Sequence, residues 1–95
     1  MKFSTKIKSG KCIVFFWSSW CGPCHDLSSL KKIKTNNKDI KVILVNIEEQ
    51  PEISNEYSIL IVPTYIFFQD SIPINYAFGI QTFDSLSEII KKSYF

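Results

Sequence analysis

The residues of this chain best suited to chemistry are two cysteines, Cys21 and Cys24, within the stretch Trp20–Cys24. The apolar run Cys12–Trp17 precedes them and a helix-like pattern follows, so the pair is predicted where a strand passes into a helix. The first sulfur then lies at the start of that helix, where unpaired N–H groups and the helix dipole favour an anion. A thiol held there ionises more easily, and the thiolate is the reactive form.

The two residues between the cysteines suit such a site. Gly22 lets the backbone bend and leaves the space over the sulfurs open, and Pro23 fits a first helical turn, where its missing N–H costs nothing. The second sulfur, one turn further on, faces the first and can close a disulfide with it. A ring this small gains only about 2 kcal/mol from loop entropy, so the pair predicts a disulfide that opens and closes rather than a structural one.

Length and composition predict one small globular domain, residues 1–95. The chain is 45% hydrophobic, which favours a folded core. Its net charge of +2 comes from interspersed charges without a basic stripe, so we expect no nucleic-acid partner. Three cysteines do not make the disulfide framework of a small secreted protein.

The N-terminal segment carries no targeting signal that we recognise. Residues 1–11 are charged throughout and lack the apolar core of a signal peptide. The apolar run before the cysteines is far too short to cross a bilayer, so we expect no membrane partner. The sequence therefore predicts a cytoplasmic monomer, in a compartment where disulfides are usually transient or catalytic.

Two apolar strands flank the first helical pattern. Cys12–Trp17 is apolar on both faces, which is typical of a central strand buried on each side. The helix predicted from Cys21 carries Leu27 and Leu30 on its apolar face, and a second apolar strand covers Ile40–Ile47. Together these elements predict a right-handed parallel βαβ unit.

The second half of the chain predicts a short helix, a hairpin and a last helix. Residues 48–57 contain Pro51 and indicate a turn followed by a short helix. The strands Tyr65–Phe68 and Ile74–Phe78 are separated by a polar turn and form a hairpin. Thr82 can cap a final helix, whose apolar face consists of Phe83, Leu86, Ile89 and Ile90.

From residue 3 to its C-terminus, the chain resembles the thioredoxin family. The resemblance rests on motifs in the family's order and close to its spacing: Phe16–Cys24, Asn46–Glu48, Tyr57–Ile59, Val62–Thr64 and Gly79. A lone Cys-x-x-Cys is a weak signal, but Trp-Cys-Gly-Pro-Cys with a later Pro-Thr before an aromatic strand is a strong one. The resemblance implies a thioredoxin-like α/β/α sandwich around a mixed sheet of about four strands, with the family's N-terminal edge strand missing.

The resemblance also implies a function and a set of roles. Cys21 would attack a disulfide of a client protein, Cys24 would resolve the mixed disulfide, and a thioredoxin reductase would restore the dithiol. No cofactor other than this pair is implied. Pro63 would follow a cis peptide bond and face the sulfurs. The motif residues Trp20, Gly22 and Pro23 would shape the site, and clients would dock on Trp20, Ile61, Val62, Pro63, Thr64 and Gly79.

The chain departs from the family's pattern beside the second cysteine. Phe15 stands where thioredoxins usually carry a buried aspartate, and Leu44 stands in place of its lysine partner. Water or another group must then accept the proton of Cys24, or the resolving step is slower. Among the side chains, Glu48 and His25 are the nearest candidates. The family's helical proline is also absent, so the helix after the motif is expected to be straighter. We expect turnover to depend on pH differently from that of an aspartate-containing thioredoxin.

Several residues have a second interpretation. Cys21 and Cys24 could be half of a zinc site, although only Cys12 and His25 remain to complete four ligands, and Cys12 is better explained as a core residue. His25 could be a cation that stabilises the Cys21 thiolate, or simply an exposed helical residue. The domain as a whole could also be a binding or adaptor module that uses the docking groove without rapid turnover. A third interpretation is a reductase dedicated to one client, with slow turnover because Phe15 replaces the usual aspartate.

Overall fold

The apolar run that begins at Cys12 lies in the central strand β1 (Lys11–Trp17) of the computed structural model, which describes residues 2–95. β1 pairs in parallel with β2 (Ile40–Asn46) and antiparallel with β3 (Thr64–Gln69). β3 pairs antiparallel with β4 (Ile72–Phe78), so the strand order is β2-β1-β3-β4. The mixed four-stranded sheet and the hairpin predicted from the sequence are confirmed.

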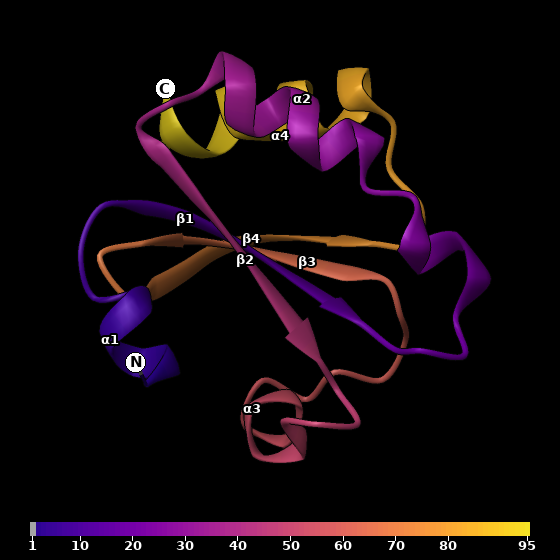
Figure 1. Ribbon diagram of the computed structural model, residues 1–95. Helices are drawn as coiled ribbons and strands as arrows, with labels where there is room; N and C mark the ends of the chain where they lie inside the picture. The colour runs from indigo at the N-terminus through magenta and orange to yellow at the C-terminus, as the bar shows by residue number, and fades with distance from the viewer. Residues whose placement is uncertain (1) are drawn as a thin grey trace.

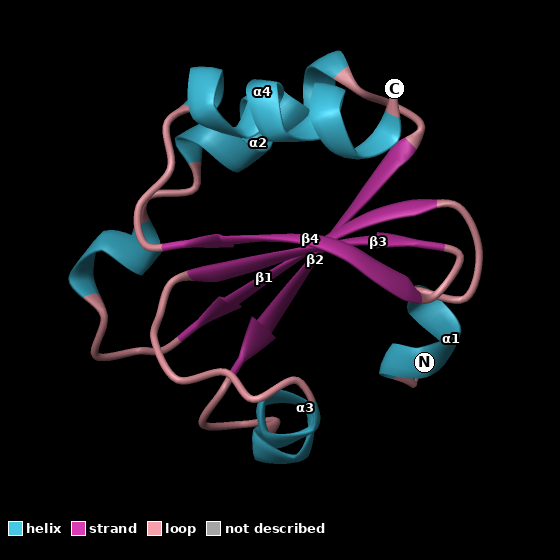
Figure 2. Cartoon of the chain, turned by 180° about the vertical axis from the view of Figure 1, so that it is seen from behind, coloured by secondary structure: helices cyan, strands magenta, loops and turns pink. Residues whose placement is uncertain are grey.

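Helices cover both faces of this sheet. Figures 1 and 2 show α2 (Ser28–Asn36) and α4 (Phe83–Tyr94) together on one face. The short helices α1 (Phe3–Lys6) and α3 (Pro51–Glu56) lie on the opposite side. This is the predicted three-layer arrangement, and among residues 2–95 the first strand is β1, as expected for a chain without the additional edge strand.

The side chains of β1 divide the core into two halves. Because successive residues of a strand point to opposite faces, Ile13 and Phe15 pack in the cluster beneath α2 and α4. Cys12, Val14 and Phe16 pack in the second cluster, on the side of α3. All five are buried, which is why this strand is apolar throughout rather than alternating.

The prediction of one continuous, straighter helix from Cys21 is wrong. A short 3-10 helix, Gly22–His25, comes first, and α2 begins only at Ser28. Between them Asp26 has an extended backbone, with φ −88° and ψ 100°. Its carboxylate accepts hydrogen bonds from the Ser28 N–H at 3.1 Å and the Ser28 hydroxyl at 2.7 Å, and so provides a partner for the first backbone N–H of α2.

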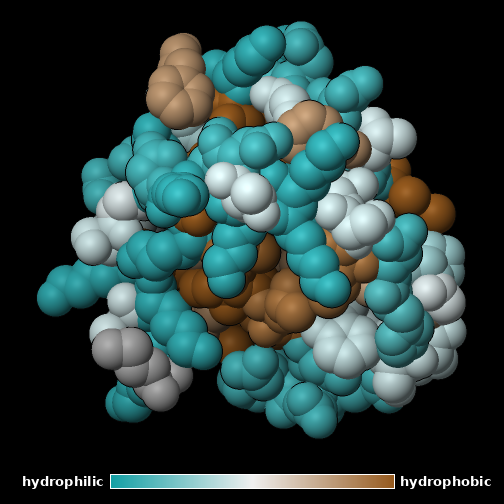
Figure 3. Space-filling view, turned by 45° about the horizontal axis from the view of Figure 1, so that its top comes forward, coloured by the Kyte–Doolittle hydropathy of each residue, from teal (hydrophilic) through white to brown (hydrophobic). Residues whose placement is uncertain are grey.

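The outer surfaces of α2 and α4 are polar. Thr82 caps α4 as predicted, because its hydroxyl accepts a hydrogen bond from the Ser85 N–H at 3.0 Å. Leu86 and Ile90 are buried, whereas the lysines of α2 are exposed. Figure 3 shows hydrophilic side chains over much of this side, with hydrophobic ones visible between them. No helix within residues 2–95 is long and apolar enough to cross a membrane.

The edge strand β4 exposes its larger apolar side chains. Ile72, Ile74, Tyr76 and Phe78 are exposed, whereas Ala77 is buried against the α2–α4 side of the sheet. The predicted alternation is present, but the apolar residues point to the side of the short helix α3, which leaves them uncovered. An apolar surface therefore runs along this edge of the sheet.

Candidate functional site

Cys21 and Cys24 are joined in a disulfide at the end of β1, with their Cα atoms 5.4 Å apart. Cys21 precedes the 3-10 helix, and its carbonyl accepts a hydrogen bond from the Cys24 N–H at 3.1 Å. Cys21 is 8% exposed and Cys24 is 1% exposed. The helix that starts here has a single turn, so the helix dipole acting on the first sulfur is smaller than that of the long helix expected from the sequence.

Ser19 fixes the loop that leads into the cysteine pair. Its N–H and its hydroxyl both donate to Oε1 of Glu48, each at 2.7 Å. Its carbonyl oxygen lies 3.1 Å from Nε2 of His25. The His25 ring also meets the ring of Trp17 edge-on, with centroids 5.7 Å apart. The hydrogen bonds from Ser19 hold the pKa of the Glu48 carboxyl below its usual value.

The Val62–Pro63 peptide bond is cis, and Pro63 lies close to the motif. Pro63 and Pro23 line the same hollow, which has a volume of about 320 Å³. The Pro63 carbonyl accepts a hydrogen bond from the Gly79 N–H at 2.8 Å. Gly79 has a φ of +82°, a conformation that favours glycine, so this residue suits the turn that brings the end of β4 beside the proline.

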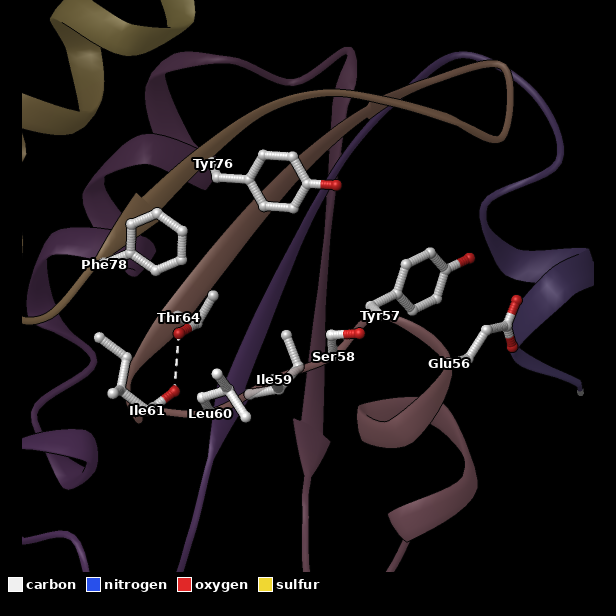
Figure 4. Close-up of a pocket in the computed structure, with 9 residues that line it drawn as sticks. All are labelled: Glu56, Tyr57, Ser58, Ile59, Leu60, Ile61, Thr64, Tyr76 and Phe78. Carbon is white, nitrogen blue, oxygen red and sulfur yellow. Dashed lines mark hydrogen bonds between the residues drawn. The ribbon is translucent and has the colours of Figure 1, made fainter.

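Two adjoining hollows lie on the other side of the motif. Trp20, Ile61 and Val62 line the first, whose volume is about 330 Å³. The second, of about 640 Å³, lies between β4 and the segment 56–61, and Figure 4 shows the rings of Tyr76 and Phe78 on one side of it. The segment 59–61 lines both hollows, so an apolar surface continues from Trp20 to the edge strand.

Comparisons with known proteins agree with this geometry. The model of the family described as Thioredoxin matches residues 1–92. The chain belongs to the thioredoxin family. It is 32% identical over 92 residues to the thioredoxin of Staphylococcus epidermidis. The aligned part covers 95% of this chain and 88% of that protein. Over the same extent it is 29% identical to the thioredoxin of Staphylococcus aureus.

A solved structure of the same family has a closely similar fold. The oxidised form of mitochondrial thioredoxin 3 from Saccharomyces cerevisiae superposes with a TM-score of 0.86 at 27% identity. The match covers 95% of this chain and 86% of that one. The chain is therefore a thioredoxin-family protein whose Cys21–Cys24 disulfide is that of a thiol–disulfide oxidoreductase.

Several docking residues expected from the thioredoxin resemblance lie together beside the cysteine pair. We call this apolar surface, which includes Trp20, Ile61 and Val62, the rim. Trp20 is 69% exposed and Ile61 is also exposed, whereas Val62 is half-buried. Thr64 is buried, and its hydroxyl donates to the Ile61 carbonyl at 2.7 Å, so its side chain braces the rim. Gly79 lines neither apolar hollow and reaches the site only through its hydrogen bond to Pro63.

Sequence reasoning missed several apolar residues of the same rim. Leu60 is 92% exposed, and Phe78 and Ile80 are exposed as well. Leu60 lines both adjoining hollows, and Ile80 lines the hollow shared by the two prolines. The available signal was a concentration of large apolar residues in segments outside the predicted core strands and helices.

Apolar side chains occupy the interior beside Cys24. Phe15 is 2% exposed and pairs in register with Leu44 on β2 and with Tyr65 on β3. The rings of Phe15 and Tyr65 lie 5.0 Å apart. Burial, with a smaller contribution from the charge of Asp26, raises the pKa of Tyr65 to about 12. Tyr65 is therefore a neutral phenol at physiological pH.

Cys12 lies apart from the other two cysteines. It belongs to the core cluster on the opposite face of the sheet, and the described residues contain no group of three or more side chains placed to hold a metal. The residues that the zinc alternative requires are therefore not brought together. Burial raises the pKa of the Cys12 thiol to about 11, and the charge of Lys41 only partly opposes this.

We expect Cys12 to resist alkylation in the folded protein. After reduction and brief treatment with iodoacetamide near neutral pH, mass spectrometry should find the label on Cys21 and none on Cys12, because a buried, protonated thiol is unreactive. The same treatment in guanidinium chloride serves as the control and should label Cys12 as well. Rapid labelling of Cys12 in the native protein would contradict this placement.

Proposed function

We propose that this thioredoxin-family protein acts as a protein-disulfide reductase, with Cys21 as the attacking thiol and Cys24 as the resolving thiol. The observation that carries the proposal is the unequal burial of the two cysteines, which lie beside an exposed apolar rim. An incoming disulfide meets Cys21 first, because Cys24 is almost wholly covered. Cys24 then displaces the client sulfur from Cys21, which releases the client reduced and leaves the pair oxidised.

Clients dock through an apolar segment next to their disulfide. The surface formed by Trp20, Leu60, Ile61 and Val62 adjoins the cysteine pair and continues towards Tyr76. Exposed apolar surface of this kind marks interaction sites, because covering it removes apolar area from water. The rim therefore favours clients whose disulfide lies in an exposed, largely apolar stretch of chain.

The proposal includes partners and a setting. Proteins of this family work with disulfide-containing clients and with a reductase. For this chain we assign the second role to a thioredoxin reductase, and the pair needs no further cofactor. We also propose that residues 1–95 act as a single domain and a monomer in the cytoplasm, where reversible dithiols usually work.

The reduction of insulin by dithiothreitol tests this function. The oxidoreductase should accelerate the precipitation of the reduced insulin chains in proportion to its concentration, because Cys21 attacks insulin disulfides and dithiothreitol restores the dithiol. The equilibrium potential of the pair against glutathione, measured alongside, decides between reductant and oxidant. A potential as high as those of disulfide-forming enzymes would contradict the assigned direction.

The alternative is a binding module that uses the same apolar rim. It is supported by exposed apolar residues that lie beyond the cysteine pair, such as Tyr76 and Phe78 at the hollow between β4 and the segment 56–61. Such a module would bind clients without accelerating insulin reduction, and its binding would survive loss of the cysteines. The absence of any acceleration in the insulin assay would favour this alternative over the reductase.

A further inference from the structure

The second step of the proposed reaction requires a proton acceptor near Cys24. Cys24 is 1% exposed, and burial disfavours the charged form of a thiol. Only the thiolate attacks a disulfide, so the Cys24 proton must leave before or during the attack on Cys21. Phe15, on the sheet beneath the pair, offers no atom that could accept it.

One cavity next to Cys24 contains a side chain that could accept this proton. It has a volume of about 90 Å³ and is lined by Trp17, Cys24, His25, Leu27 and Leu44. Among these residues only Cys24 and His25 have ionisable side chains. The cavity is large enough for a water molecule, so a proton could pass between them directly or through water.

The hydrogen bond from His25 to Ser19 determines which ring nitrogen is free. Nε2 lies 3.1 Å from the Ser19 carbonyl oxygen, which can only accept a hydrogen bond. Nε2 must therefore carry a proton, and in the neutral ring the lone pair is left on Nδ1. A neutral imidazole in this tautomer can accept a proton at Nδ1 without giving up its contact with Ser19.

Glu48 holds Ser19 in place and so orients the ring. Its carboxylate accepts both hydrogen bonds that Ser19 can donate, at 2.7 Å each, and its own N–H donates to Asn46 Oδ1 at 2.8 Å. Trp17 contacts the ring from β1. The imidazole is therefore fixed by the end of β1 and by the loop that follows β2.

The other ionisable groups near the pair are less suitable acceptors. Glu48 and Asp26 already accept hydrogen bonds, from Ser19 and from Ser28, and both have pKa values below the usual ones. A lowered pKa makes a carboxylate a weaker base. Tyr65 is a neutral phenol, which can donate a hydrogen bond but is already protonated and so cannot accept the Cys24 proton. The neutral imidazole of His25, by contrast, has a free lone pair on Nδ1 that can accept a proton.

We propose that His25 accepts the Cys24 proton in the resolving step, with Glu48 acting through Ser19 as a positioning residue. The proposal rests on the function proposed above. The proton passes from Cys24 Sγ to Nδ1, and the thiolate attacks Cys21 Sγ. A Cys21–Cys24 bond forms as the bond from Cys21 to the client sulfur breaks. The client leaves as a thiolate and takes the proton from the imidazolium, so the dithiol supplies the two electrons that reduce the client's disulfide.

A two-step reaction with 5,5′-dithiobis(2-nitrobenzoate) tests this role. Attack by Cys21 releases one thionitrobenzoate, and attack by Cys24 on the resulting mixed disulfide releases the second, so one stopped-flow trace separates the steps. In His25→Gln, whose amide can still donate to Ser19 but takes up no proton, the second phase should slow by about 100-fold or more near neutral pH. The difference should shrink as pH rises, because hydroxide then removes the Cys24 proton.

The outcomes separate this inference from the function on which it rests. If the first phase is absent in the wild type, the proposed reductase activity fails whatever His25 does. If the first phase is normal and the second phase of His25→Gln matches the wild type at every pH, the role of His25 is wrong. Slowing by the same factor at all pH values would also reject it, because a merely structural effect would not depend on hydroxide.

Nuclear magnetic resonance tests the positioning of the ring separately. The chain has one histidine, so its ring nitrogen signals need no assignment. We expect them to show the Nε2–H tautomer in the wild type and a mixture of tautomers in Glu48→Ala. Glu49→Gln is the matched control, because this neighbouring exposed carboxylate has no contact with Ser19 and its loss should leave the signals unchanged. An unchanged tautomer in Glu48→Ala would remove Glu48 from the proposal.

Discussion

Replacing Cys21 with serine is expected to abolish the acceleration of insulin reduction, leaving only the rate of dithiothreitol alone. Cys21 is the more exposed of the two cysteines and the proposed attacking thiol, and a serine hydroxyl at this position would remain protonated and unreactive towards sulfur. Loss of a nucleophile removes the whole covalent route rather than a part of it. The measurement is the initial rate at several protein concentrations, compared with that of the wild type.

Two further cysteine variants make this result specific. Cys24→Ser should retain the attack by Cys21 and accumulate mixed disulfides with clients, which nonreducing electrophoresis would reveal. Cys12→Ala should keep full turnover, because Cys12 lies in the core cluster on the other face of the sheet. Retained turnover in Cys21→Ser, or trapping by Cys21→Ser rather than by Cys24→Ser, would reverse the roles assigned to the two thiols.

Much of the fold follows from local sequence patterns. The run Cys12–Phe16 is apolar on both faces because β1 has a strand on each side and helices above and below, so its burial could be read without a structure. The location of the cysteine pair could be predicted as well, because its spacing places both sulfurs at one strand-to-helix junction. Thr82 marked the start of α4 by the same kind of local rule.

The predictions of the helix after the cysteine pair and of the buried face of β4 failed for two different reasons. In the helix two local signals competed, and in β4 the packing of other elements determined which side chains are buried. The apolar period continues across Asp26, so the sequence pattern did not show that Asp26 turns the chain and accepts the Ser28 N–H at the start of a second helix. In β4, alternation defined two faces but could not tell which would be covered, because that depends on which helices pack against the edge of the sheet. The strand consequently exposes Tyr76 and Phe78 and buries Ala77.

The contact between Glu48 and Ser19 could not be read from the sequence at all. The two residues lie far apart in the chain, and only the parallel pairing of β1 and β2 brings the ends of these strands together. Glu48 and His25 could be named as candidates by proximity to the motif, but the hydrogen bonds of Ser19 distinguish the orienting group from the acceptor. Side-chain orientation of this kind is a property of the folded chain.

Substituting Phe15→Asp, which introduces the residue type common in the family, is expected to destabilise this protein severely. Phe15 is 2% exposed and packs against Tyr65, so its loss alone should lower the free energy of unfolding by about 3–5 kcal/mol. The new carboxyl would have no cationic partner, because Leu44 is its neighbour on β2. An unpaired buried charge adds to the cost of the lost packing.

The penalty should also depend on pH, with a sign that identifies its cause. Burial raises the pKa of a carboxyl in the folded state above the unfolded value of about 4. The variant is therefore most stable when this group is protonated. Its stability relative to wild type should therefore fall as pH rises from about 4 to neutrality. Urea denaturation at both ends of this range measures the effect.

Two matched variants separate the packing loss from the charge. Phe15→Leu should cost much less and lose the same free energy at both pH values, because no ionisable group is introduced. Adding Leu44→Lys to Phe15→Asp should recover part of the stability at neutral pH, since residue 44 lies in register with residue 15 and is exposed enough for an ammonium group to stay hydrated. A single Phe15→Asp variant as stable as the wild type at neutral pH would mean that water or a counter-charge reaches this site. The apolar interior on which the proposed role of His25 depends would then be wrong.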